Sequence, residues 1–294
     1  MVADIAQVDP DWAWSPYQPN DRQPWTRGLA AHLYRRAGFG VNSHQLDEAV
    51  KQQPAALIKK FIAAGEESEE FRREIEDLVQ TMLSSNDARN LSAWWLYRLL
   101  DTPDQLLEKT TLFWHGHFAT GAEKVRDPKL MYQQNQLLRR HALGRFPDLV
   151  QEISRDPAML LYLDSVTNRK AHPNENFARE VMELFCLGEG NYSEKDVQEV
   201  ARCFTGWEIR RKKFYFNKFQ HDEGRKTILG ESGNFGGEDA ARVILKQRAA
   251  PQFIVRKMIR YFMFDEPMPP DSLVNPLAEK FFNEGYDIAR LVER

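Results

Sequence analysis

The residues FAREVMELFCLGEGNYSEKDVQEVARCFTG, at positions 177–206, carry the strongest structural signal in the chain. Apolar residues recur there every three or four positions, as they do along the buried face of a helix. They are Phe177, Val181, Leu184 and Phe185 in the first half and Val197, Val200, Ala201 and Phe204 in the second. Ser193 and Asp196 have the spacing of a capping box, and Gly188 and Gly206 stand where helices end in a left-handed residue. The stretch predicts two helices that pack on one core.

Similar signals extend this prediction to most of the chain. A residue that can cap a helix precedes a proline at Thr102–Pro103, Asp127–Pro128 and Asp156–Pro157, which is the pattern of a helix start. One region differs, because Lys213–Gln220 alternates aromatic and polar residues and Lys226–Leu229 follows a turn-like Asp-Glu-Gly. We therefore predict a mainly α protein, a multi-helix globular bundle with one small β-hairpin at about residues 207–230.

The first 26 residues lack periodicity and are rich in proline, aspartate and tryptophan. They predict an irregular N-terminal arm, residues 1–26, whose Trp12, Trp14 and Trp25 would pack onto the rest of the molecule. No feature divides the remainder. Residues 27–294 are therefore expected to form a single helical domain that is large enough to bury its own core.

Charge and composition exclude several classes of protein. Lys plus Arg number 40 against 43 Asp plus Glu, a formal net charge of −3, so nucleic acid is not the expected partner. No run of about 18 apolar residues could span a membrane, and the N-terminus lacks the basic and apolar regions of an export signal. Cys186 and Cys203 both fall in helical patterns, which favours buried thiols. The cytoplasm is the default expectation.

The segment His115-Gly116-His117 is the first candidate for chemistry. Two imidazoles one residue apart can chelate a metal when the backbone is extended, and Gly116 would permit this if it ended the helix. If the helix continues instead, the two side chains diverge by about 200° around its axis. In that case His117 continues an apolar face and His115 lies near the carbonyls of the helix C-terminus.

A helix start dense in polar residues, HPNENFAREVME, is the second candidate. Arg179 lies four residues from both Glu175 and Glu183, which predicts a ladder of ion pairs on the helix surface. Glu180 has no cation within reach along the helix, so it faces water, finds a distant partner, or acts as an acid, base or metal ligand. Glu180 is thus the catalytic candidate, with Asn176 and Arg179 as binding residues.

The third candidate is His221-Asp222, an imidazole beside a carboxylate, which is common in metal and acid–base sites. Aspartate is also a frequent turn former. Combined with the segments above, these residues would suit a divalent transition metal such as zinc, iron or manganese. The predicted ligands are His115, His117, Glu183, His221 and Asp222. Convergence in the structure would support such a site, and dispersed histidines would count against it.

The basic and aromatic run RRKKFYFNKF, at residues 210–219, is the fourth candidate. It resembles the grooves that bind single-stranded nucleic acid or another polyanion, with Arg211 and Lys213 as binding residues. The plainer alternative is a half-buried strand whose aromatic side chains face inward and whose lysines protect an exposed edge.

Several ordered motifs resemble the domain of unknown function 1800 family, a large uncharacterised bacterial family. They are AHLYRRAGFG at 31–40, FWHGHFA at 113–119, PNENFARE at 173–180, LGEGNYS at 187–193 and ARCFTGW at 201–207. The resemblance runs from about Trp25 to the end of the chain. It implies a mostly helical protein that is frequently encoded beside a sulfatase-like protein, which becomes an expected partner. It implies no catalytic residue.

The chain departs from this family in two respects. Many relatives carry an export signal, which the N-terminus here lacks. Many also continue well past the segment Gly285–Arg290, so the C-terminus is expected to be truncated.

Three hypotheses for function follow from these patterns. The leading one is a metal-dependent enzyme in which Glu180 either completes the ligand shell of the metal or acts as general base toward metal-bound water. The first alternative is a non-catalytic binding or assembly partner of a neighbouring enzyme, whose polar motifs fix helix packing. The second alternative is polyanion binding through the basic and aromatic hairpin.

Overall fold

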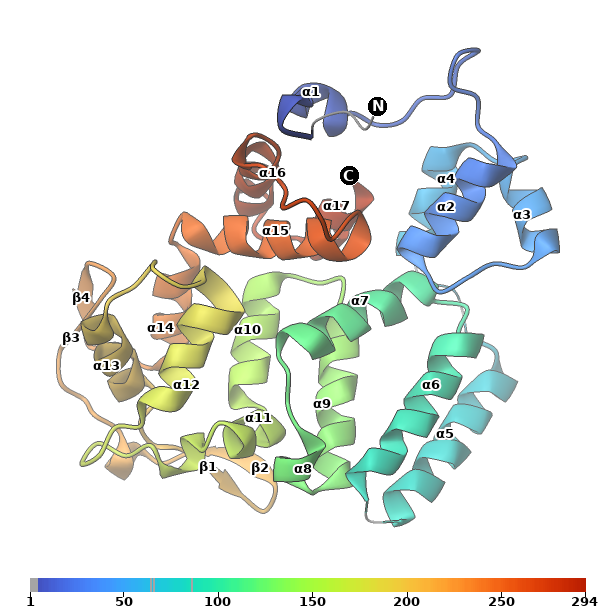
Figure 1. Cartoon of the computed structure of the whole chain (residues 1–294). Helices are drawn as coiled ribbons and strands as arrows, with labels where there is room; N and C mark the ends of the chain where they lie inside the picture. Colours follow the sequence, from blue (N-terminus) through green and yellow to red (C-terminus); the bar gives the residue numbers. More distant parts are fainter. Residues whose placement is uncertain (1–4, 64, 66, 86) are drawn as a thin grey trace.

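The computed structural model describes residues 5–294 except 64, 66 and 86, and these residues are mainly helical (Figure 1). The predicted fold class is confirmed. The N-terminal helices are η1 (Ile5–Gln7), α1 (Pro10–Ala13), α2 (Arg27–Ala37), α3 (Ser43–Ala49), α4 (Pro54–Ile62), α5 (Glu69–Ser84), η2 (Ala88–Asn90) and α6 (Leu91–Asp101). Two small apolar clusters lie among these helices, one among α2, α3 and α4 and one between α5 and α6.

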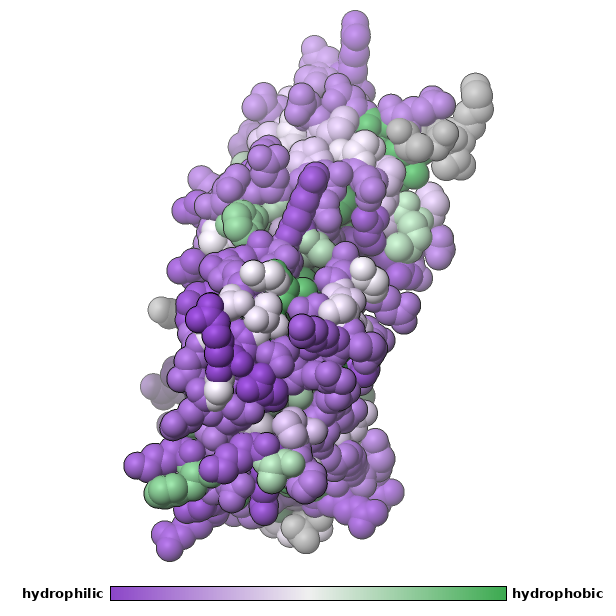
Figure 2. Space-filling view, turned by 90° about the vertical axis from the view of Figure 1, so that its left-hand side faces the viewer, coloured by the Kyte–Doolittle hydropathy of each residue, from purple (hydrophilic) through white to green (hydrophobic). Residues whose placement is uncertain are grey.

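The remaining helices surround one large core. They are α7 (Gln105–His117), α8 (Ala122–Val125), α9 (Pro128–His141), α10 (Phe146–Arg155), α11 (Pro157–Tyr162), η3 (Ser165–Thr167), α12 (Glu175–Glu180), the π-helix η4 (Val181–Leu187), α13 (Glu194–Cys203), η5 (Lys218–Gln220), α14 (Gly237–Leu245), α15 (Ala249–Phe262), α16 (Asp271–Asn283) and α17 (Ile288–Glu293). Helix α15 crosses the molecule in contact with α16 on one side and η4 on the other (Figure 1). The face on the side of β3, β4 and α13 is mostly hydrophilic (Figure 2).

The β structure differs from the predicted single hairpin. Strand β1 (Trp207–Arg210) pairs with β2 (Lys213–Phe216), and β3 (Lys226–Ile228) pairs with β4 (Glu231–Gly233), so the two runs that we expected to pair belong to separate two-stranded sheets. The β1–β2 turn has φ of 50° at Arg211 and 61° at Lys212. A tight hairpin turn needs positive φ at both central residues and usually uses Asn-Gly. An Arg-Lys pair therefore gave no recognisable turn signal.

Helix capping follows the sequence at most of the predicted positions. The Ser193–Asp196 capping box is present, and Asp127 and Asp156 accept main-chain N–H bonds at the starts of α9 and α11. The predicted helix start at Thr102 is wrong, because Thr102 ends α6. Helix α7 begins after Asp104. Helix α7 then runs without interruption through Gly116, so the glycine does not end it.

The first predicted helix of the 177–206 stretch changes its winding at residue 181. Residues Val181–Leu187 form a π-helix, closed by a bond of 3.1 Å from the Gly188 N–H to the Glu183 carbonyl. A π-helix places more residues in each turn than an α-helix does. Leu184, which the α-helical spacing placed in the core, is consequently 48% exposed.

Two of the three early tryptophans pack as expected. The indole N–H of Trp14 donates to the Leu273 carbonyl at 2.9 Å, and that of Trp25 donates to the Ala49 carbonyl at 3.2 Å. Trp12 is 67% exposed, so its predicted packing is wrong. Its helix α1 is a single turn without a buried residue, which leaves the ring no apolar surface to cover.

A buried carboxylate joins three helices on the α5–α6 side of the core. Glu108 of α7 is fully buried, and its carboxylate accepts bonds from Arg98 of α6 at 2.7 Å and from Arg139 of α9 at 3.0 Å. Trp95 adds an indole N–H at 3.2 Å. Burial acts to raise the pKa of Glu108, but the two guanidinium groups hold it below its ordinary value.

We predict that Glu108→Gln destabilises the protein by about 3–5 kcal/mol, because Arg139 is left buried without its counter-charge and Arg98 keeps only Glu67. Urea unfolding at neutral pH measures the loss. The exposed pair Glu231–Lys246 supplies the control, since Glu231→Gln is expected to cost about 1 kcal/mol or less. Because the pKa of Glu108 is lowered on folding, its contribution is lost as pH falls through the folded value. The two variants would cost equal amounts if Glu108 did not hold the helices.

Candidate functional site

A cleft of about 420 Å³ opens between α7 and α15. Its lining residues are Leu112, Phe113, Gly116 and His117 of α7, Lys257, Arg260 and Tyr261 of α15, and Asp265 after α15. Residues three and four apart share one face of a helix. That spacing explains how 113, 116 and 117 on one helix meet 257, 260 and 261 on the other.

His117 forms the buried inner part of the cleft and is 7% exposed. Its Nε2 lies 3.0 Å from the Phe185 carbonyl of the π-helix. A carbonyl only accepts, so this contact assigns the proton to Nε2 and leaves a lone pair on Nδ1. Burial, assisted by the nearby charge of Lys257, lowers the pKa of His117 well below its ordinary value. The imidazole is therefore neutral, with Nδ1 as an acceptor.

Lys257 is held between that acceptor and the π-helix. Its Nζ donates to His117 Nδ1 at 3.2 Å and to the Leu184 carbonyl at 3.1 Å, and it lies 4.5 Å from the centre of the Phe253 ring. Burial lowers the pKa of Lys257 to about 8. An ammonium group has three N–H donors. Two of them are engaged in these bonds, so one position on the nitrogen is left for a ligand in the cleft.

The rest of the cleft combines aromatic walls with a second cation. The Phe113 and Tyr261 rings lie 5.2 Å apart, and the Tyr261 hydroxyl donates to the Lys109 carbonyl at 3.2 Å. Burial raises the pKa of Tyr261 to about 12, so the phenol stays neutral. Arg260 bonds Asp265 Oδ1 through Nε at 3.0 Å and through Nη2 at 2.6 Å. The arrangement suits a small ligand with an anionic end and an apolar body.

The two predicted histidine ligands point to different surroundings. Because α7 is helical through both, His115 leaves the cleft and packs edge-on against Trp95, with ring centres 4.8 Å apart. Burial lowers the pKa of His115. His117 alone of the predicted site residues lines the cleft.

The predicted site residues of α12 and η4 have other partners. Arg179 bonds Glu194 at 2.8 Å and Glu175 at 3.5 Å, and the expected pairing with Glu183 is absent among the described contacts. The π-helix turns Glu183 away, toward the Tyr192 hydroxyl that it accepts from. Burial and the negative charge of Glu183 raise the pKa of Glu180, and the positive charge of Arg179 opposes this rise. The amide of Asn176 donates to the Leu163 carbonyl at 3.1 Å.

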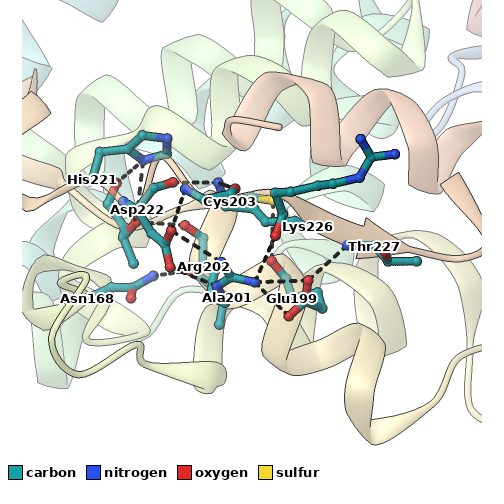
Figure 3. A network of polar contacts seen from close by, with 12 residues as sticks. Asn168, Glu199, Ala201, Arg202, Cys203, His221, Asp222, Lys226 and Thr227 are labelled. Atoms are coloured by element: carbon teal, nitrogen blue, oxygen red, sulfur yellow. Dashed lines mark hydrogen bonds and ion pairs between the residues drawn. The ribbon is translucent and has the colours of Figure 1, made fainter. Parts of the chain in front are cut away.

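His221 and Asp222 belong to a polar network centred on Arg202 (Figure 3). His221 Nδ1 lies 2.9 Å from the Thr205 carbonyl, and Asp222 accepts from Arg202 Nε at 2.7 Å. Arg202 also donates to Glu199 at 2.8 Å. These bonds tie the loop before β3 to α13. Because the charged groups of this network bond to one another, the network indicates a role in packing the loop onto the helix.

The predicted metal ligands therefore do not converge. Within the described residues, no group of three or more histidine, cysteine, aspartate or glutamate side chains has a metal-binding arrangement. Cys186 and Cys203 are buried as predicted, and burial raises the pKa of both thiols. The arrangement gives no support to the metal site.

The basic hairpin presents more aromatic surface than an inward-facing strand would. Phe214 packs on Trp207, but Phe216 is 45% exposed and Phe219 is 72% exposed. Arg211 and Lys213 are exposed as well. The prediction that the aromatic side chains face inward is thus correct for Phe214 and wrong for Tyr215, Phe216 and Phe219.

The sequence reasoning missed Lys257, Arg260 and Tyr261. One signal for Lys257 was present, since this lysine lies inside the apolar run of residues 251–264 and shares a helix face with Phe253 and Tyr261. A lysine among apolar neighbours on one face is a candidate for partial burial and a shifted pKa.

The fold and the cleft define a mainly helical protein with a lysine held by histidine between two helices. The chain belongs to the DUF1800 family of proteins of unknown function, whose family model matches residues 32–294. No curated protein and no solved structure matches the chain. None of the helices in the described part of the chain has the length and apolarity that crossing a bilayer requires.

Proposed function

We propose that this protein binds a small organic anion in the cleft between α7 and α15. One observation carries the proposal: Lys257 lines the cleft, and its nitrogen makes two hydrogen bonds to the described residues, which leaves one of three N–H donors without such a bond. Because His117 is neutral, it neither repels the ammonium nor supplies a competing counter-charge. A bound carboxylate would provide the charge-assisted bond that Lys257 lacks.

The shape of the cleft indicates the rest of the ligand. Phe113 and Tyr261 offer apolar ring surface beside the ammonium. Small-molecule sites commonly combine such walls with a few polar groups that orient the ligand. An aryl carboxylate, such as phenylacetate, matches both features. The proposal differs from both binding hypotheses drawn from the sequence, which were assembly with a neighbouring enzyme and polyanion binding by the hairpin. A sulfatase-like partner rests on the family resemblance, and the cleft does not depend on it.

We predict that phenylacetate binds more tightly than its neutral amide, and that Lys257→Met weakens phenylacetate binding by about tenfold or more. A hydrogen bond to a charged group contributes about 1.5–3 kcal/mol, and 1.4 kcal/mol is about tenfold in affinity. Isothermal titration calorimetry measures both effects. Lys246→Met, at an exposed lysine on α14's C-terminal end, is the matched control.

The same titration has a defined pH dependence. The Lys257 ammonium loses its proton as pH rises through about 8, so affinity for the anion falls above that pH. Equal affinity for acid and amide, or binding that Lys257→Met leaves unchanged, would contradict the proposal.

A second candidate function is polyanion binding by the β1–β2 hairpin. The exposed rings of Phe216 and Phe219 and the exposed side chains of Arg211 and Lys213 lie in one short segment and support it. Rings that bases can stack on and cations that follow the phosphates are the two parts of a single-strand binding surface. The net charge of −3 argues against attraction of the whole molecule to a polyanion, so binding would be confined to the hairpin.

For this candidate we predict that labelled oligothymidylate binds with an affinity that falls steeply with salt. The double variant Arg211→Asn, Lys213→Gln should weaken binding and flatten the salt dependence. Asparagine is chosen because it tolerates the positive φ of residue 211. Lys246→Gln and Lys280→Gln together serve as a control of equal charge change. Fluorescence anisotropy makes the measurement, and no binding at low salt would end this candidate.

A further inference from the structure

We infer that Lys257 forms an imine with an aromatic α-keto acid bound in the α7–α15 cleft. The inference rests on the proposed function, because it requires that the cleft accept a small organic anion. It adds a covalent step and names the ligand class. The geometry of the Lys257 nitrogen is the starting point.

A neutral lysine amine has two N–H bonds and one lone pair. In this structure His117 Nδ1 and the Leu184 carbonyl are two acceptors for two N–H bonds, at 3.2 Å and 3.1 Å. Both acceptors keep their places in the neutral state of the amine. The lone pair is then the free position on the nitrogen, and Lys257 is among the residues that line the cleft. The two hydrogen bonds therefore leave the lone pair of the neutral amine available to a ligand in the cleft.

The protonation state supports this arrangement. Burial lowers the pKa of Lys257 to about 8, so a substantial fraction of the side chain is the neutral amine near that pH. Lysines made nucleophilic by an apolar pocket or a nearby cation are a recurring source of imines with carbonyl compounds. For Lys257 the cause is the burial, since Arg260, one turn along α15, is already paired with Asp265.

The α-keto acid class follows from the two cations and the aromatic walls. Arg260 bonds Asp265 through Nε and Nη2, and its Nη1 has no partner among the described contacts, which leaves a donor for a carboxylate. A keto group next to that carboxylate would then lie toward Lys257. Phe113 and Tyr261 provide surface for an aryl substituent. Phenylpyruvate has all three parts.

The covalent step balances without an oxidant or reductant. The Lys257 lone pair attacks the keto carbon, a C–N bond forms, and the carbonyl π electrons move to oxygen. The nitrogen of this adduct gives one of its two protons to the negatively charged oxygen, which forms a neutral carbinolamine. The hydroxyl then leaves with the remaining N–H proton, as water, and the imine forms. Amine and ketone are thus converted to imine and one water.

The test is reductive trapping of the full chain with phenylpyruvate and sodium cyanoborohydride, followed by peptide mass spectrometry. We expect one reduced adduct, on Lys257, whose yield rises as pH approaches 8 and falls at least tenfold when excess phenylacetate occupies the cleft. Lys257→Arg has no nucleophilic amine, so it should lose the adduct. Lys246→Arg is the control.

The outcomes separate this inference from the proposed function. Phenylpyruvate that binds by calorimetry without forming an adduct on Lys257 overturns the imine and leaves anion binding in place. No binding of either phenylpyruvate or phenylacetate overturns both. Adducts spread evenly over the exposed lysines also overturn the inference. Circular dichroism shows whether Lys257→Arg is folded, and the phenylacetate competition tests the same point on the unaltered chain.

Discussion

Two neighbouring main-chain carbonyls of the π-helix η4 accept bonds from side chains on two other helices. Phe185 accepts from His117 of α7, and Leu184 accepts from Lys257 of α15. The last four carbonyls of any helix have no partner within it, which accounts for Phe185. Leu184 is free because of the π-helical winding, since the Gly188 N–H bonds the Glu183 carbonyl in its place. The position of Lys257 in the cleft between α7 and α15 therefore depends on this local change of winding.

The π-helix also accounts for much of what the sequence could and could not predict. The helical class, the Ser193 cap and the buried cysteines follow from spacing and capping chemistry, which are local properties. The wider turn of a π-helix leaves no local signature in the sequence. The α-helical spacing therefore placed Leu184 in the core and paired Glu183 with Arg179. The Arg-Lys turn at 211–212 was missed for a similar reason, since its positive φ values are imposed by the paired strands.

The candidate site was harder to predict because it depends on contacts between distant segments. His117 and Lys257 are 140 residues apart, and neither stands in a recognised catalytic motif. His115 and His117 attracted attention as a pair, but a continuous helix separates their side chains and gives each a different environment. His117 is distinguished by its buried, neutral imidazole. The Phe185 carbonyl sets the tautomer by its bond to Nε2, and Nδ1 accepts a bond from Lys257.

A crystal structure of the protein with phenylacetate tests the central claim most directly. The account predicts the carboxylate within about 3 Å of Lys257 Nζ, with the ring against Phe113 and Tyr261 and the His117–Phe185 bond intact. An empty cleft at saturating ligand, or phenylacetate bound elsewhere on the molecule, would contradict the account.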